Sequence, residues 1–152
     1  IMYHRIEFTD SELDRINYRG SWPLPNVWLG VSCENQEMVE ARVPSLLRTP
    51  AAVRLVSAEP LIGPIQFNYA LSGIQFYPDV NVRRKLDWVI VGSESGSGPR
   101  QMKEDWVRSI RDECGRSSTP LFYKQRLDKF GDKISIPFLD GKQYTEYPED
   151  RR

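Results

Sequence analysis

Four short apolar segments, spaced about thirty residues apart, constrain the fold of this chain more than any other feature of its sequence. They are rich in β-branched and aromatic residues and cover residues 27–32, 53–57, 88–92 and 121–124. Nearly continuous apolar runs of this length are typical of strands covered on both faces, as in parallel sheets. A parallel strand with its crossover needs about thirty residues, so the spacing predicts four consecutive βα units.

Helical sequence follows the first of these segments. Asn35 is well placed to cap a helix over residues 36–42, because its side chain can accept a hydrogen bond from the first turn. Pro44 is expected to end or kink that helix, with one further turn over residues 45–48.

A second helix is predicted after the third segment, over residues 104–114, with Gly115 as its stop. Its apolar residues share one stripe, formed by Trp106, Val107, Ile110 and Cys114. Residues 66–84, between the second and third segments, are polar, aromatic and punctuated by Gly and Pro. This composition indicates an inserted loop or hairpin over the rim.

The C-terminal part of the chain is predicted to be extended. Residues 134–136 and 138–144 are strand-like, and the Asp140–Gly141 pair within the second of them predicts a β-hairpin. Residues 147–152 are interpreted as a charged, frayed terminus.

Together these elements predict one α/β domain over residues 1–152. Four βα units are half of an eight-unit barrel, which typically needs about 250 residues. The expected fold is therefore a partial (half) TIM-like barrel of about four parallel βα units with a C-terminal β-hairpin. A half barrel leaves sheet edges open. The chain is accordingly the C-terminal portion of a larger barrel, or is completed by another polypeptide, or folds as an open α/β sheet.

Composition argues against several classes of function. The 21 Lys and Arg balance the 21 Asp and Glu, so a general basic surface for nucleic acid is not indicated. No apolar run approaches the ~20 residues that span a bilayer, and the first ten residues lack the apolar stretch of a secretory signal. Cys33 and Cys114 have no Cys or His nearby at metal-ligand spacing, so no metal site is expected. The two cysteines are expected to be reduced thiols of a cytoplasmic protein. His4 is the only histidine, which disfavours Ser-His-Asp and Cys-His mechanisms.

Polar side chains follow each predicted strand. Ligands of parallel α/β folds bind at the carboxyl ends of the strands. The candidates for ligand binding at this rim are Glu34, Asn35, Glu59, Ser93, Glu94, Arg100, Lys124 and Gln125. Three carboxylates brought together would repel one another unless a cation or a ligand amine lay between them. Such a rim suits a divalent metal, an amine-bearing ligand or a general acid–base pair, and no catalytic residue is singled out.

Ordinary structural roles are open for the same residues. Asn35 is expected to cap a helix, Glu59 to begin a turn, and Lys124 to pair with one of the glutamates. The Gly-rich loop over residues 92–100 precedes a helix, as phosphate-binding loops do, but it has neither the Walker A spacing nor the dinucleotide fingerprint. It is interpreted as a rim loop, with Arg100 available to clamp an anion.

Several sequence motifs occur together, and in order, along most of the chain. They cover residues 22–32, 34–36, 56–64, 87–96, 105–108, 122–125 and 139–141. These motifs resemble the C-terminal portion of a phage and prophage family of unknown function, named after phage gene products thirty-seven and sixty-eight.

The resemblance implies a radical-SAM-like barrel, whose N-terminal part carries three closely spaced cysteines for a [4Fe–4S] cluster that binds S-adenosylmethionine. This chain has no such motif, Cys33 lies where the family tolerates other residues, and residues 1–21 are not expected to supply the missing strands. The resemblance carries over to residues that would line the mouth of the complete barrel: Glu34, Asn35, Glu59, Ser93, Glu94, Lys124 and Gln125. Ser93 departs from the usual Gly-Gly-Glu pattern, so close approach of a ligand to the backbone is less certain there.

Three functions remain open on this basis. The first is the C-terminal half of a radical-SAM-like enzyme, inactive as this chain alone and completed by a missing N-terminal barrel half. The second is a non-catalytic remnant or interaction module that self-associates or binds a partner through the open barrel edge. A weaker third is a metal-dependent hydrolase that uses Glu34, Glu59 and Glu94. The resemblance also implies a phage- or prophage-encoded protein in the bacterial cytoplasm.

Overall fold

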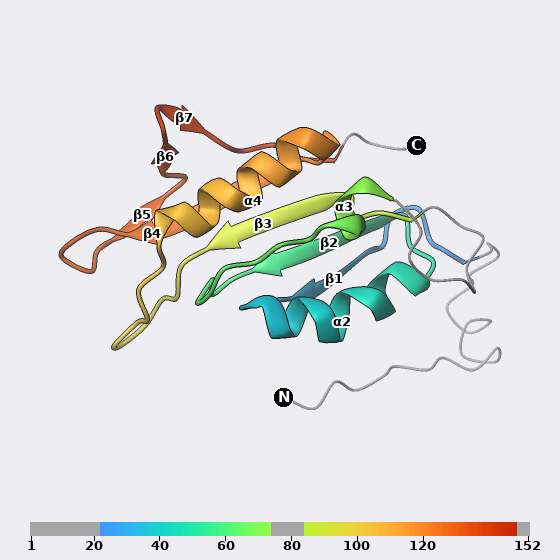
Figure 1. Ribbon diagram of the computed structural model, residues 1–152, viewed down its shortest axis with the longest axis horizontal. Helices are drawn as coiled ribbons and strands as arrows, with labels where there is room; N and C mark the ends of the chain where they lie inside the picture. The colour runs from blue at the N-terminus through green and yellow to red at the C-terminus, as the bar shows by residue number, and fades with distance from the viewer. Residues whose placement is uncertain (1–21, 74–83, 149–152) are drawn as a thin grey trace.

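A five-stranded, mostly parallel sheet forms the centre of the computed structural model, which describes residues 22–73 and 84–148 (Figure 1). The strands lie side by side in chain order: β1 (Trp28–Ser32), β2 (Val53–Ala58), β3 (Trp88–Gly92), β4 (Leu121–Leu127) and β5 (Lys133–Ser135). The first four are parallel, and β5 runs antiparallel to β4. The prediction of an α/β fold with four parallel strands is confirmed. Residues 134–136 were predicted to be extended, but the antiparallel pairing of β5 with β4 was not anticipated.

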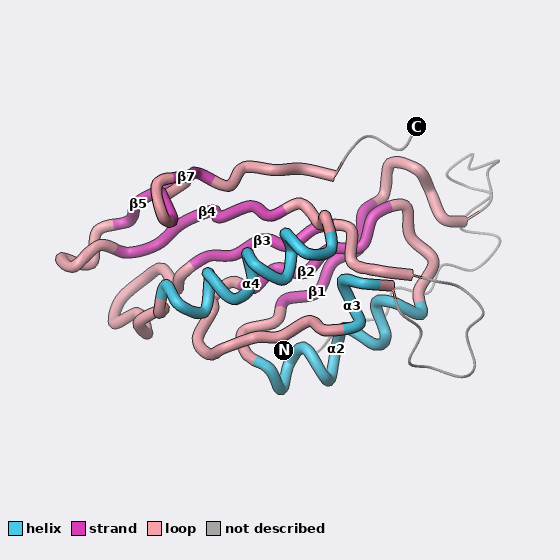
Figure 2. Tube along the Cα trace, turned by 45° about the horizontal axis from the view of Figure 1, so that its top comes forward, coloured by secondary structure: helices cyan, strands magenta, loops and turns pink. Residues whose placement is uncertain are grey.

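Three helices pack on the same face of this sheet, as Figures 1 and 2 both show. They are α2 (Gln36–Arg48), α3 (Tyr69–Ser72) and α4 (Glu104–Ser117). No helix in the described part of the chain covers the opposite face. Nor is any of the described helices long and apolar enough to cross a membrane.

Helix α2 is continuous over the two helical segments that the sequence predicted on either side of Pro44. Pro44 lies inside the helix rather than at its end. The buried residues of α2 recur at helical spacing on both sides of this proline, at Val39, Val43, Leu46 and Leu47. Their burial against the sheet favours an unbroken helix over the local preference of proline. The alternative in which Pro44 ends the helix was therefore wrong, and the predicted turn over residues 45–48 is confirmed as part of the same helix.

Helix α4 also passes its predicted end. Gly115 lies within the helix, and the left-handed residue at the C-cap is Ser118, with φ of 52°. The Ser118 N–H donates to the carbonyls of Cys114 and Gly115, and the Ser117 hydroxyl lies within hydrogen-bond distance of the carbonyls of Glu113 and Cys114. These contacts satisfy the free carbonyls without a glycine. The predicted apolar stripe is confirmed, with Val107 and Ile110 fully buried.

The connection from β2 to β3 differs from a regular βα unit. It runs back along the helical face between α2 and α4, and in its described part only the four residues of α3 are helical (Figure 1). Its apolar side chains fill the space that a crossover helix would occupy, with Leu61, Ile65 and Phe67 at most 1% exposed. The described part of the expected insertion, residues 66–73, therefore packs on the core rather than over the rim. Residues 74–83 lie outside the described residues.

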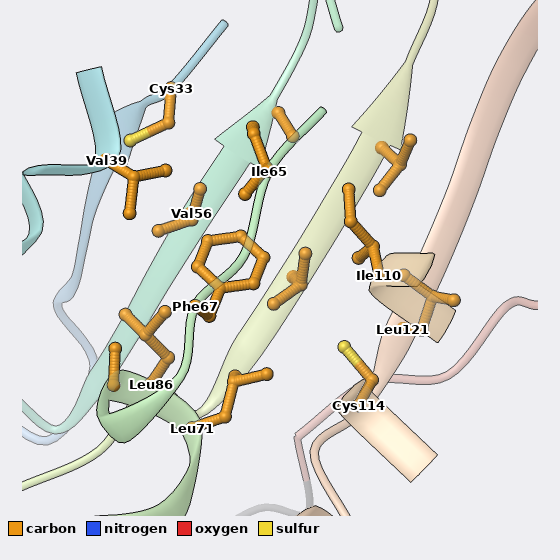
Figure 3. Close-up of a cluster of buried hydrophobic side chains, with 14 of the residues drawn as sticks. Cys33, Val39, Val56, Ile65, Phe67, Leu71, Leu86, Ile110, Cys114 and Leu121 are labelled. Atoms are coloured by element: carbon orange, nitrogen blue, oxygen red, sulfur yellow. The ribbon is translucent and has the colours of Figure 1, made fainter. Parts of the chain in front are cut away.

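The hydrophobic core lies between the sheet and these covering segments. Figure 3 shows side chains from several elements meeting there, among them Val56 of β2, Phe67 of the connection and Ile110 of α4. Both cysteines belong to this core, with Cys33 fully buried and Cys114 2% exposed.

The C-terminal segment closes one edge of the sheet. The predicted hairpin is confirmed as β6 (Phe138–Leu139) and β7 (Lys142–Gln143), which Asp140 and Gly141 join with positive φ. Beyond it, the backbone of residues 144–146 pairs with the first residues of β4. Tyr147 is not frayed, because its ring packs on Trp88 at a centroid distance of 5.0 Å. Residues 149–152 of the expected frayed terminus lie outside the described residues, as do residues 1–21.

Candidate functional site

The carboxyl ends of β1, β2, β3 and β4 meet at one edge of the sheet, called the rim below. Parallel pairing fixes this, because Ser32 lies beside Ser57 and Ala58 lies beside Val91. The residues that follow these strands therefore emerge next to one another (Figure 1). The rim brings Glu34, Glu59 and Glu94 to neighbouring strand ends, as the spacing of the strands predicted.

Glu59 and Lys124 form an ion pair across the rim. The Lys124 ammonium lies 3.1 and 3.0 Å from the two carboxylate oxygens of Glu59, although the residues are 65 positions apart. The carboxylate packs against the Cα atom of Gly92: a Cβ there would lie 3.0 Å from the Glu59 carboxyl carbon. Glycine at the end of β3 thus makes room for the acidic partner of Lys124.

The loop after β3 is closed by a second ion pair. Arg100 donates from Nη2 and Nε to Glu94 at 2.6 and 2.8 Å, and its backbone N–H donates to the same carboxylate at 2.8 Å. These hydrogen bonds lower the pKa of Glu94 to about 2. The Arg100 guanidinium, which could otherwise bind an external anion, is therefore already paired with Glu94. The negative charge of Glu34 also acts on Arg100, which places the two glutamates in the same electrostatic neighbourhood.

Glu34 is held by an arginine of helix α2. Nη1 of Arg42 lies 3.2 Å from each carboxylate oxygen and 2.6 Å from the backbone carbonyl of Ser32. The next residue, Asn35, accepts a hydrogen bond from the Met38 N–H at 3.1 Å. The predicted helix-capping role of Asn35 is confirmed, and its side-chain oxygen is directed into the helix.

Ser93, directly after β3, and Gln125, within β4, join these two strands below the exposed rim. Gln125 Nε2 donates to the Ser93 carbonyl at 3.0 Å, and the Ser93 N–H donates to the Gln125 carbonyl at 3.1 Å. Both residues are 2% exposed. A register shift in the β3–β4 ladder at Gly92 accompanies this exchange. Their arrangement fixes the position of the neighbouring Gly92 and Lys124.

A family model described as a protein of unknown function, DUF5131, matches residues 2–148, which is nearly the whole chain. The chain belongs to the DUF5131 family. No curated protein and no solved structure matches it.

Each rim glutamate of the DUF5131 chain has its own cation, in the pairs Glu34–Arg42, Glu59–Lys124 and Glu94–Arg100. Mutual repulsion among the three carboxylates is relieved by these side chains. In the described residues, no group of three or more His, Cys, Asp or Glu side chains is placed to hold a metal ion.

The described cysteines of the DUF5131 chain do not suit an iron–sulfur cluster. Burial raises the pKa of both Cys33 and Cys114 to about 12, whereas a ligand to iron is a thiolate. Cys33 lies in the core beside β1 and Cys114 in helix α4, so their side chains do not share an accessible site. The cluster that the sequence resemblance implies has no ligands among them.

Two residues of the rim were missed by sequence reasoning. Gly92 could have been recognised, because a glycine that ends an apolar strand directly before polar residues often marks a close approach. Arg42 carried no such signal, since it lies on a helix among other charged residues and only the fold directs it to Glu34.

A cavity of about 920 Å³ lies away from the rim, near the amino ends of β2 and β4. Its lining comes from these strand ends, from the last turns of α4 and from the C-terminal segment, and includes Lys85, Asp87, Arg116 and Glu146. Because parallel α/β folds bind ligands at the carboxyl ends of strands, the rim rather than this cavity is the candidate functional site.

Proposed function

We propose that the DUF5131 chain forms the ligand-binding wall of a larger radical-SAM-like barrel, with the ligand at the rim. The observation that carries the proposal is that, within residues 22–73 and 84–148, helices cover the four parallel strands on one face only. In a βα barrel the helices lie outside, and the uncovered face of each strand lines the interior.

The uncovered face has the residue pattern of a barrel interior. Tyr123 of β4 is fully buried on the helical face, and its neighbours Phe122 and Lys124 point the other way. Trp28, Trp88 and Phe122 pack edge to face at the amino ends of the strands. The Glu59–Lys124 pair lies at the carboxyl ends. An apolar floor below a charged mouth is the arrangement that a barrel enzyme uses.

The sequence resemblance implies S-adenosylmethionine as the ligand. Its methionyl group carries an ammonium and a carboxylate, and Glu59 and Lys124 offer charges complementary to both. The cluster would require cysteines from the part of the barrel outside this chain's described residues. Glu94–Arg100 and Glu34–Arg42 are the other charged pairs at this rim.

Site-resolved NMR tests the proposal on the chain itself. Titration with S-adenosylmethionine, and in parallel with S-adenosylhomocysteine, is expected to shift amide signals at the strand ends, near residues 32–35, 57–60, 92–95 and 124–125. Glu59→Gln should weaken binding, whereas Glu40→Gln, a carboxylate on the exposed side of helix α2, should not. Shifts confined to the amino ends of the strands, or none at millimolar ligand, would contradict the proposal.

A second function is favoured by the exposed aromatic side chains of the uncovered face. Trp28 is 40% exposed although it belongs to a strand, and exposed aromatic groups are common in protein interfaces. In this alternative the chain is a non-catalytic module that binds a partner or a second copy. Light scattering after size exclusion tests self-association: a monomer at all concentrations argues against binding of a second copy.

A further inference from the structure

The two edges of the sheet differ in a way that fixes where further strands can join. At the β4 edge, β5 pairs with Gln125, Arg126 and Leu127. The rest of that edge is occupied by backbone hydrogen bonds between Tyr123 and Tyr144, between Glu146 and Leu121, and between Ile136 and Lys124. Every residue of β4 thus lies beside an antiparallel neighbour on this side, and no room is left there for a parallel strand.

The β1 edge is different. Within residues 22–73 and 84–148, β1 pairs with β2 alone, and no segment lies along its outer side. Alternate residues of β1 are exposed, and Leu29 and Val31 are only half-buried on the helical face, where the central strands are fully buried. An uncovered apolar edge strand is a template for pairing with another strand.

The backbone direction of each β1 residue follows from two contacts. In a strand, the N–H and C=O of one residue point to the same side, and those of the next residue point to the other. The Cys33 N–H donates to the Ser57 carbonyl of β2, so the backbone N–H and C=O groups of Leu29 and Val31 also point towards β2. The Ser32 carbonyl accepts a hydrogen bond from Arg42, on the side away from β2. The backbone N–H and C=O groups of Gly30 and Ser32 therefore point away from β2.

We propose that the outer edge of β1, through the backbone of Gly30 and the N–H of Ser32, receives a parallel strand from the missing half of the barrel. The chain order of the sheet supports this occupant, since each strand from β1 to β4 lies beside the one before it, and a preceding βα unit would lie beside β1. The Ser32 carbonyl is already bound by Arg42, so the incoming ladder begins at the Ser32 N–H. This inference rests on the proposed barrel.

Hydrogen exchange of the full chain, alone and with the polypeptide translated from the DNA immediately upstream, tests the edge. In the chain alone, the Gly30 and Ser32 amides should exchange rapidly and the Val31 amide slowly. In the complex, Gly30 and Ser32 should slow by roughly 100-fold or more. Two results overturn the proposal: no complex, or a complex in which these two amides still exchange rapidly. Protection already present in the chain alone, whether or not it rises with chain concentration, also overturns it.

Proline variants separate pairing from folding. Ser32→Pro removes only an outward N–H and should leave the melting temperature of the chain nearly unchanged while weakening the complex at least tenfold. Ser32→Ala keeps the N–H and should bind normally. Val31→Pro removes an inward N–H and should lower the melting temperature. If the Ser32→Pro chain binds the upstream polypeptide as tightly as the unsubstituted chain does, the outer edge of β1 does not pair with a strand of that polypeptide. The NMR titration with S-adenosylmethionine is a separate measurement. If the ligand still shifts the rim amides while the β1 amides stay unprotected in the complex, this inference is refuted and the proposed function is not.

Discussion

The carboxylate of Glu59 lies directly over Gly92, in the space that a side chain on β3 would fill. Glu59 follows β2 and Lys124 belongs to β4, so their ion pair crosses over the end of β3. The pair can form there because Gly92 has no side chain in the way.

Gly92→Ala is expected to displace the Glu59 carboxylate from Lys124. The added Cβ would lie 3.0 Å from the carboxyl carbon, closer than normal packing allows. Because the clashing group is the end of a flexible side chain, the free energy of unfolding should change by no more than about 1 kcal/mol. Amide shifts at Glu59 and Lys124, together with urea unfolding, measure the two effects.

Gly115→Ala provides the matched glycine control. No atom lies within 4 Å of the Cβ position, and the residue is inside α4. This substitution should stabilise the chain by roughly 0.5–1 kcal/mol, because alanine loses less backbone entropy in a helix. A larger loss of stability for Gly115→Ala than for Gly92→Ala would contradict the account of both sites.

The Glu94 carboxyl should titrate far below its ordinary value. Hydrogen bonds from Arg100 lower its pKa from 4.5 to about 2. The pair therefore contributes fully to stability above pH 4.5, and its contribution is lost as the pH falls from there towards 2. Carboxyl NMR should show this midpoint, and Arg100→Gln should return it towards 4.5. A midpoint near 4.5 in the unsubstituted chain would mean that the loop is open in solution.

Both cysteine thiols should be unreactive in the folded chain. Burial raises the pKa of Cys33 and Cys114 from 9.0 to about 12, so the thiol form persists in the folded state. Between these values the unfolded chain ionises first, and stability should decline as the pH rises. Ellman's reagent at pH ~8 should label both thiols in urea and neither in the native chain over the same interval. Rapid labelling of Cys33 alone would show that the core opens beside β1.

Phe67→Ala tests whether the irregular β2–β3 connection is part of the core. The ring is 1% exposed beneath the sheet-covering segments, and truncation of such a ring costs about 3–5 kcal/mol. Phe130→Ala is the control, because Phe130 is 78% exposed and should change stability by less than about 0.5 kcal/mol. Equal effects in urea unfolding would mean that residues 60–73 are not packed as described.

The sequence predicted the parallel sheet well, because strand spacing and apolar runs are direct consequences of βα geometry. Local signals at Pro44 and Gly115 were misleading, since tertiary burial on either side of Pro44 and hydrogen bonds around Ser118 outweighed them. The rim residues were identified as strand-end groups. The expected pairing of Lys124 with one of the glutamates is confirmed, but the sequence did not show which glutamate, because the choice of Glu59 depends on the register of strands that are distant in the sequence.

The antiparallel segments along β4 also limit how copies of this chain can associate. Joining two chains through their β1 strands would leave β5 and residues 144–146 as the outermost segments of the combined sheet on both sides. These antiparallel segments are short, so they offer little backbone for a further strand to pair with. The chain after β4 thus shields the longest strand of the sheet from pairing with other molecules.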